Sequence, residues 1–336
     1  MSRIAQRFLD LKTITTEPTP PVNWAIDGLI AEQDFTFISG IGGIGKSYVA
    51  ISTAVSLATQ EPLFGHFKVA ACYNVLYIDM EMAETEGVRR FSRMLRGVGA
   101  EGSKAPGNLF VGVRGTLQLD DEKAVHDLDD YIVNNKIDFV VIDSYRRVYS
   151  GDDKDSMTSN RVFKVLAHLR AKHSVGFIFI AHWRKKSAES ALNDTTERLL
   201  GSVDQRNMID CHLAVLPGGE PDTLTIVPDK SRHGDNAADQ FRIRFAHDDP
   251  VDSDGPFKLV YIEIDDGKKE MMILDLLTKI NTTEVDKWTS YTELEVSTRL
   301  KPKTLQRGIR NLISVQRIER EKVEGNWCVR MKKVGK

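Results

Sequence analysis

The sequence predicts an α/β fold in which a mostly parallel, twisted sheet is flanked by helices. Runs typical of strands alternate with runs typical of helices from Val22 to about Val260. Several strand-like runs are continuously apolar, for example residues 139–142 and 176–180. Such runs, alternating with helices, are typical of parallel strands that are covered on both faces. A glycine-rich motif that joins one strand to one helix then marks the end of the sheet at which a ligand binds.

That motif is Gly40-Ile41-Gly42-Gly43-Ile44-Gly45-Lys46-Ser47, which fits the P-loop pattern G-x-x-x-x-G-K-[ST]. An apolar run precedes it at 35–39 and a helix-like run follows at 48–58, as the motif requires. Backbone N–H groups and the helix N-terminus would bind the phosphates of ATP. We expect Lys46 to reach the β- and γ-phosphates and Ser47 to ligate Mg²⁺. The predicted nucleotide-binding residues are Gly40, Gly42, Gly43, Ile44, Gly45, Lys46, Ser47 and Tyr48.

Nine strands are predicted in all. They are predicted at 35–39, 74–79, 108–113, 137–142, 175–180, 211–216, 223–228, 240–246 and 257–264. The last four follow one another closely, which favours an antiparallel extension of the parallel sheet.

Two of these strands end in carboxylates. Residues 137–143 form an apolar strand that ends in Asp143, the Walker B pattern, and Asp143 is predicted to complete the Mg²⁺ site with Ser47. Residues 74–82 place Asp79 and Glu81 at the end of a second strand. ATP hydrolysis needs a carboxylate that orients and polarises the attacking water. Glu81 is the favoured candidate because it lies nearer the carboxyl end, with Asp79 as a supporting or structural acid.

Three further residues complete the candidate site. His182 follows the apolar strand 176–180 and is predicted either to sense the γ-phosphate or to serve a structural role. Lys230 and Arg232 follow another strand and point the same way if the segment is extended. In an oligomer they would reach the γ-phosphate bound by a neighbouring subunit; the alternative is a solvated basic turn.

The composition is that of a globular protein, with a net charge of −2. The Cys residues, Cys72, Cys211 and Cys328, show no metal-binding spacing and indicate reduced, mostly buried thiols. No apolar stretch approaches the length that crosses a bilayer, and no signal sequence is recognisable. We therefore expect a cytoplasmic protein that makes no membrane contact.

The chain divides into three parts. Residues 1–21 are expected to form a short amphipathic helix and a proline-rich tether, and residues 22–265 the nucleotide-binding domain. Residues 268–336 predict three helices and a hairpin, the order of a small winged-helix-like domain. Residues 301–336 contain eleven Lys or Arg and three Glu, a local balance of +8. This basic segment is predicted to bind duplex DNA through the helix at 302–312, or else a protein partner.

Together these residues resemble the RecA/DnaB-like ATPases, and most closely the RepA-type hexameric replicative helicases of plasmids and phages. The resemblance covers about residues 22–250 and includes the entry phrase 23–30, the P-loop and both acid-bearing strands. It implies that Glu81 is the catalytic glutamate, that His182 is a sensor, and that Lys230 and Arg232 act in trans, with Arg232 as the arginine finger. It also implies a homo-oligomer, a hexamer, with single-stranded DNA in its pore.

Two polar segments would face that pore, 145–155 and 184–206, and both carry Arg or Lys. Single-strand binding by such loops would follow the backbone without sequence preference. The alternatives to a helicase are a recombinase or recombination mediator on single-stranded DNA, and an oligomeric ATPase switch in regulation or defence.

Overall fold

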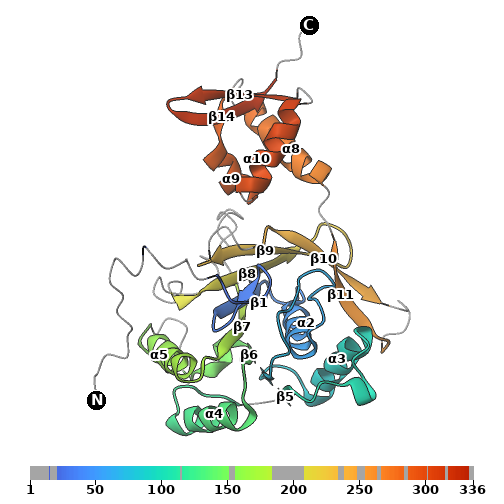
Figure 1. Ribbon diagram of the computed structural model, residues 1–336, viewed down its shortest axis with the longest axis vertical. Coiled ribbons are helices and arrows are strands. Elements are labelled where there is room, and N and C mark those ends of the chain that lie inside the picture. Colours follow the sequence, from blue (N-terminus) through green and yellow to red (C-terminus); the bar gives the residue numbers. More distant parts are fainter. Residues whose placement is uncertain are drawn as a thin grey trace.

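The computed structural model describes residues 15, 21–113, 116–150, 156–183, 208–233, 238–247, 254–262, 266–283, 287–300, 302–314 and 317–332. Its centre is a nine-stranded sheet with the order β11-β10-β9-β8-β3-β7-β6-β4-β5 (Figure 1). The strands are β3 (Phe35–Gly40), β4 (Val75–Asp79), β5 (Leu109–Val113), β6 (Phe139–Asp143), β7 (Gly176–His182), β8 (Cys211–Pro217), β9 (Thr223–Ser231), β10 (Phe241–His247) and β11 (Phe257–Ile262).

The sheet has a parallel part and an antiparallel part. Neighbouring strands from β8 through β3, β7, β6 and β4 to β5 pair in parallel, whereas β9, β10 and β11 extend the sheet in antiparallel pairs. Strand β7 lies between β3, which leads into the P-loop, and β6, which ends in Asp143. The prediction of a mostly parallel sheet with an antiparallel extension is confirmed.

Helices cover both faces of the sheet, and the side chains of each strand alternate between two cores. Helices α2 (Lys46–Thr59) and α3 (Glu84–Gly97) enclose one core, and α4 (Glu122–Asn135) and α5 (Ser156–His173) enclose the other. In β4, Val75 and Tyr77 enter the first core and Leu76 the second. This period of two, with apolar side chains on both faces, explains why the strands read as continuous apolar runs.

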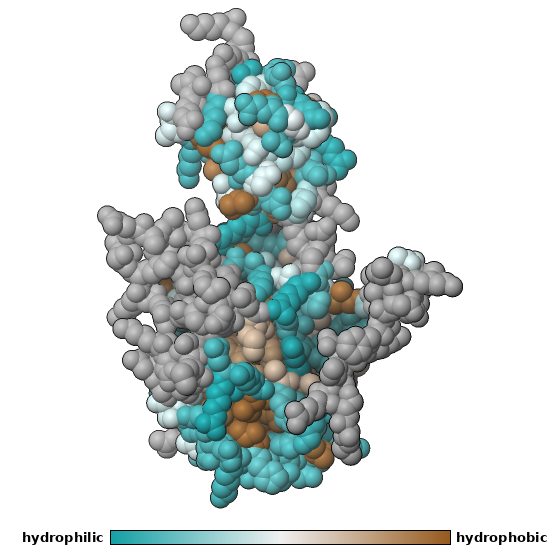
Figure 2. All heavy atoms as spheres, turned by 90° about the vertical axis from the view of Figure 1, so that its left-hand side faces the viewer, coloured by the Kyte–Doolittle hydropathy of each residue, from teal (hydrophilic) through white to brown (hydrophobic). Residues whose placement is uncertain are grey.

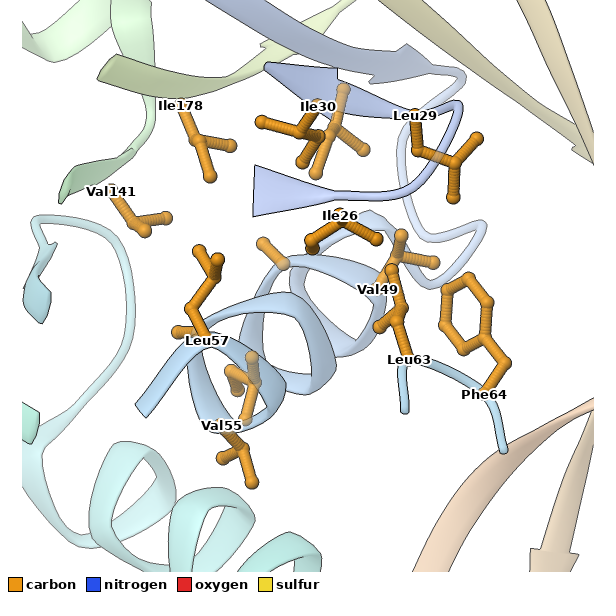
Figure 3. Close-up of a cluster of buried hydrophobic side chains, with 14 of the residues drawn as sticks. Ile26, Leu29, Ile30, Val49, Val55, Leu57, Leu63, Phe64, Val141 and Ile178 are labelled. Atoms are coloured by element: carbon orange, nitrogen blue, oxygen red, sulfur yellow. The ribbon is translucent and has the colours of Figure 1, made fainter. Parts of the chain in front are cut away.

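A short hairpin that the sequence did not predict closes the first core. Strands β1 (Trp24–Ile26) and β2 (Ile30–Ala31) pair around a turn at Gly28, whose φ is 68°. Their apolar side chains pack onto α2 (Figure 3). The segment at residues 23–30 therefore covers the part of the core that lies beside the P-loop helix α2.

The C-terminal residues form a separate unit with its own core. Its elements are α8 (Asp266–Thr283), β12 (Thr289–Ser290), α9 (Tyr291–Thr298), α10 (Pro302–Ser314), β13 (Ile318–Val323) and β14 (Asn326–Met331). The three strands form a sheet in the order β12-β14-β13. Ser290 and Glu293 form a capping box that starts α9. Hydrophilic side chains cover much of this unit on the face shown in Figure 2.

Other predictions have simpler outcomes. Cys211 and Cys328 are buried, whereas Cys72 is exposed, and all three are free thiols. Among the described residues, no helix is both long enough and apolar enough to cross a bilayer. The predicted N-terminal helix and most of its tether lie outside the described residues, as does the loop 184–206.

Candidate nucleotide site

The P-loop connects the end of β3 to the start of α2, as predicted. Gly40 has no room for a side chain, because a Cβ there would lie 2.6 Å from the carbonyl oxygen of Val215. Gly45 has a φ of 105°, which disfavours any residue with a Cβ, and it lies against the ring of Phe245. The turn therefore depends on these glycines, and its backbone N–H groups lie at the N-terminus of α2.

Lys46 is buried at the base of the loop, with 4% of its surface exposed. Its ammonium donates to the carbonyl oxygen of Ile41 at 2.7 Å and lies 3.3 Å from Nδ1 of His182. Burial lowers the pKa of Lys46, and the nearby carboxylates of Asp143 and Glu81 oppose that shift. A phosphate bound in the loop would offer this buried cation a stronger partner than a neutral carbonyl.

The two residues predicted to hold Mg²⁺ lie together. The hydroxyl of Ser47 donates to the carboxylate of Asp143, and the hydroxyl of Tyr77 donates to the same carboxylate at 3.3 Å. Burial raises the pKa of Asp143 to about 6, and the charges of Asp79 and Glu81 add to the rise. A buried carboxylate beside a serine hydroxyl, near other acids, is a donor set that suits a hard divalent cation. Ser47 and Asp143 would therefore hold Mg²⁺.

Glu81 lies on the turn after β4 and reaches across to the end of β6. Its Oε1 accepts a short hydrogen bond from the hydroxyl of Ser144, which follows Asp143 through a cis peptide bond. Its Oε2 lies 3.6 Å from Nε2 of His182. These two contacts, that with His182 foremost, lower the pKa of Glu81 to about 2. The carboxylate is held in its charged form, as a water-polarising base requires.

Asp79 differs from Glu81 in position and in partners. The two residues are two positions apart, so a strand that continued through Glu81 would point both side chains to the same face of the sheet. Asp79 is fully buried, and its Oδ1 accepts from the backbone N–H groups of Glu81 and Met82, each at 2.9 Å. It lies opposite Asp143 in the β4–β6 register. Asp79 therefore fixes the turn that presents Glu81.

His182 joins the phosphate-binding lysine to the predicted catalytic acid. The ring lies at the end of β7, with Nδ1 facing Lys46 and Nε2 facing Glu81. A neutral ring with its proton on Nε2 accepts from the ammonium and donates to the carboxylate. His182 is thus placed where a γ-phosphate sensor would be expected.

Aromatic side chains and an arginine surround Tyr48, the last predicted nucleotide-binding residue. Its ring packs edge-on against Phe245 and Phe257, and the guanidinium of Arg90 lies 4.7 Å from its centroid. Arg90, from α3, was not predicted, because one arginine on a charged helix gives no distinguishing pattern in the sequence. Ser144 was not predicted as a site residue either, because a single serine after a strand gives no distinguishing pattern.

Lys230 and Arg232 lie beside the amino ends of the parallel strands, whereas the P-loop lies at their carboxyl ends. Strand β9 runs antiparallel to β8, so that Ser231 pairs with Cys211, which in turn pairs with Thr36 near the start of β3. Lys230 is within the strand and Arg232 follows it. The guanidinium of Arg232 is half-exposed and binds Oδ1 of Asp210 at 2.9 Å. Neither cation meets the other site residues within one copy of the chain.

Asp210 collects several partners at that end of the sheet. Its Oδ2 accepts from Arg170 at 2.7 Å and from the backbone N–H of Phe35 at 3.0 Å, while its backbone carbonyl accepts from the N–H of Arg232. The guanidinium of Arg170 also lies 4.1 Å above the ring of Phe35. No local pattern predicted this cluster, because its members are far apart in the chain.

The chain was compared with known proteins and solved structures. Residues 3–188 match the family model of the AAA domain. Solved structures with similar folds include the RadB recombinase (16% identity, TM-score 0.48, 68% of this chain and 91% of that chain). A KaiC-like protein from the hyperthermophilic archaeon Pyrococcus horikoshii OT3 has 13% identity and a TM-score of 0.48, covering 72% of this chain and 100% of that chain. No curated protein matches the sequence. Because the family model spans more than half of the sequence and includes the whole P-loop, the chain belongs to the AAA domain family.

Proposed function

We propose that the protein is an ATP-hydrolysing, ring-forming DNA motor, a helicase of the replicative type. One observation carries the proposal. The phosphate-binding residues lie at the carboxyl end of β3, whereas the cations Lys230 and Arg232 lie beside the amino end of that strand. Strand β3 spans six residues, so its two ends are on the order of 17 Å apart at about 3.3 Å per residue. A site that uses both sets of residues needs two copies of the chain.

The hydrolysis half of the site is assigned residue by residue. Backbone N–H groups of the P-loop and Lys46 bind the phosphates, and Ser47 and Asp143 hold Mg²⁺, which would neutralise charge on the β- and γ-phosphates. Glu81 accepts a proton from the attacking water. His182 contacts Lys46 and Glu81 together, so it is placed to respond to a γ-phosphate.

The second half comes from the neighbouring copy. Arg232 is half-exposed at the edge of the sheet, and Lys230 is next to it on the same strand end. Burial lowers the pKa of Lys230, and the nearby positive charge of Arg232 lowers it further. In the proposed ring, Arg232 leaves Asp210 and stabilises negative charge on the neighbour's γ-phosphate as an arginine finger.

The C-terminal unit is proposed to be a winged-helix-like domain that binds duplex DNA. Its helix–strand–helix–helix–strand–strand order and its three-stranded sheet support this. Helix α10 would be the recognition helix, with Arg310 on its exposed surface. At the β13–β14 hairpin, Arg320 lies 4.7 Å over the ring of Trp327, which is 49% exposed.

The decisive experiment is strand displacement on a forked DNA duplex with Mg²⁺ and ATP. We expect unwinding by the wild type and none by Lys46→Ala or Glu81→Gln at equal protein concentration. Single-stranded DNA should stimulate ATP hydrolysis, and the stimulation should fall steeply with salt. Hydrolysis without displacement at any protein concentration would overturn the helicase assignment.

Negative-stain imaging with ATP separates the remaining alternatives. Closed rings support the motor, whereas filaments on single-stranded DNA would identify a recombinase or mediator. Rings that neither bind single-stranded DNA nor unwind duplex would identify an oligomeric switch.

A further inference from the structure

Three polar side chains form a connected group inside the sheet, below the P-loop. Ser39 and His212 are fully buried on the adjacent strands β3 and β8. The Ser39 hydroxyl lies 2.6 Å from Nε2 of His212, and Nδ1 of His212 lies 3.3 Å from Oδ2 of Asp229. No residue of this group has a role in the hydrolysis site described above.

A β-bulge aims Asp229 at the histidine. Lys230 pairs with His212 and Pro228 with Leu213, so that Asp229 is an extra residue in β9. A bulge of this kind redirects a side chain that would otherwise point elsewhere. The bulge thus brings the strand end that carries Lys230 and Arg232 into contact with the buried histidine.

Hydrogen-bond contacts connect Trp183 through Ser39 and His212 to Asp229. The indole Nε1–H of Trp183 donates to Ser39 Oγ at 2.8 Å. In the tautomer of His212 that carries its proton on Nδ1, the Ser39 hydroxyl donates to Nε2 and the Nδ1–H faces Asp229. Apolar side chains at the buried positions would avoid the cost of burying polar groups. The group therefore imposes a fixed geometry rather than adding apolar stability.

The residue that donates to Ser39, Trp183, is also bonded to the P-loop. Trp183 directly follows His182, and its backbone N–H donates to the carbonyl oxygen of Gly40 at 3.1 Å. His182 in turn contacts Lys46. A phosphate that drew the ammonium of Lys46 away from Ile41 and His182 would remove a contact of His182, the residue directly before Trp183.

We propose that His212 is a positioning residue which, through Ser39 and Asp229, ties the P-loop of one subunit to the strand end bearing Lys230 and Arg232. The inference rests on the proposed function, in which those two cations serve the neighbour's nucleotide. Occupancy of one site then sets the position of the cations offered to the next. His212 transmits this change without touching nucleotide itself.

The test is the cooperativity of ATP hydrolysis by assembled, full-length protein. We expect a Hill coefficient above 1 for the wild type, falling toward 1 in Trp183→Phe and in Asp229→Ala, with kcat changed less than about threefold. Asp229→Asn keeps an oxygen that accepts from Nδ1–H and should retain cooperativity. Trp288→Phe, the same substitution just before β12 in the C-terminal unit, is the matched control and should behave as the wild type.

Each other outcome has a definite meaning. Unchanged cooperativity in both Trp183→Phe and Asp229→Ala overturns the inference, as does a wild type with a Hill coefficient of 1 in verified oligomers. If Asp229→Ala fails to assemble, Trp183→Phe decides alone, because it keeps an aromatic side chain, although a smaller one, and removes the indole N–H donor. Absence of hydrolysis by the wild type would instead overturn the proposed function, and this inference with it.

Discussion

The carboxylate of Asp79 accepts a hydrogen bond from the backbone N–H of Glu81 at 2.9 Å. The two acids that end the same stretch of chain therefore perform different tasks. Asp79 holds the turn, and the side chain of Glu81 stays available beside His182 and Ser144.

Glu81→Gln is expected to bind ATP with little change in affinity and to lower kcat by about 10²–10⁴-fold, the usual contribution of a positioned acid or base. Asp79→Asn keeps an oxygen that accepts the two backbone N–H groups, so its kcat should fall much less. Nucleotide binding and single-turnover hydrolysis, measured on both variants, check this. A dead Asp79→Asn beside an active Glu81→Gln would reverse the assignment.

Asp143 should give the protein a pH-dependent stability. Burial raises its pKa from 3.8 to about 6, so the folded state binds the proton more tightly than the unfolded state. The associated stability is present below pH 3.8 and is lost as the pH rises through about 6. At 1.36 kcal/mol per pKa unit, the loss is about 3 kcal/mol. Asp143→Asn, measured without Mg²⁺ by denaturant unfolding, should therefore be more stable than the wild type at pH 8 but not at pH 4.

The same proton competes with Mg²⁺. Asp143 must be charged to bind the cation, so Mg²⁺-dependent hydrolysis should decline below about pH 6. The pKa of Glu81 is about 2, so its carboxylate stays charged through this range and does not cause the decline. An activity profile that is flat between pH 5 and pH 8 would contradict the assignment of Asp143.

Gly40 and Gly42 provide a matched pair within the P-loop. A Cβ at Gly40 would lie 2.6 Å from the Val215 carbonyl oxygen, whereas a Cβ at Gly42 would meet nothing within 4 Å. Gly40→Ala should therefore destabilise the fold by about 1–3 kcal/mol, the usual cost of overpacking. Gly42→Ala should leave stability nearly unchanged and weaken only nucleotide binding. Equal loss of stability in the two variants would show that the close approach to Val215 relaxes readily.

The sequence was sufficient wherever a local pattern carried the information. Apolar runs that alternate with helix-like runs predicted all nine strands of the large sheet, and the spacing within residues 40–47 predicted the loop that joins β3 to α2. The short strands β1, β2 and β12 were missed, because two or three residues are too few to show a period.

Long-range partners could not be predicted in the same way. Asp210 meets Arg170 and Phe35 only because β3, β8 and α5 come together in the folded chain. The bulge at Asp229 depends on the register of β8 against β9, which no local pattern in the sequence specifies. The different surroundings of Asp79 and Glu81 likewise depend on where β4 ends, because the strand stops at Asp79 and the chain then turns.

Asp210→Ala is expected to cost about 1–3 kcal/mol of stability, because Asp210 is buried but Arg170 is about one-third exposed. The substitution leaves the guanidinium of Arg170 and the backbone N–H of Phe35 without their common acceptor at a buried position. Glu220→Ala is the control, because Glu220 pairs with Arg242 and Arg244 with half of its side chain exposed, and such pairs contribute about 0–1 kcal/mol. Similar midpoints of urea unfolding for the two variants would show that the Asp210 cluster is no stronger than a surface pair.

Arg232 and the P-loop should complement each other between subunits. Lys46→Ala and Arg232→Ala are each expected to be inactive, and Arg232→Ala should still bind ATP. Mixed assemblies contain some interfaces with an intact P-loop and an intact arginine, so ATPase activity should partly return. The measurement is hydrolysis after mixing, with co-assembly verified by differential tags. Mixed assemblies without recovered activity would place Arg232 outside the trans site.

The distance between the P-loop and Arg232 has a consequence for how the proposed ATPase activity would depend on protein concentration. A single chain has no route by which Arg232, at the far edge of β9, reaches the phosphates held at the end of β3. Dilution would therefore silence the enzyme without altering any residue or unfolding any domain. Specific activity would rise with the amount of protein made, and turnover would begin only above the concentration at which copies meet.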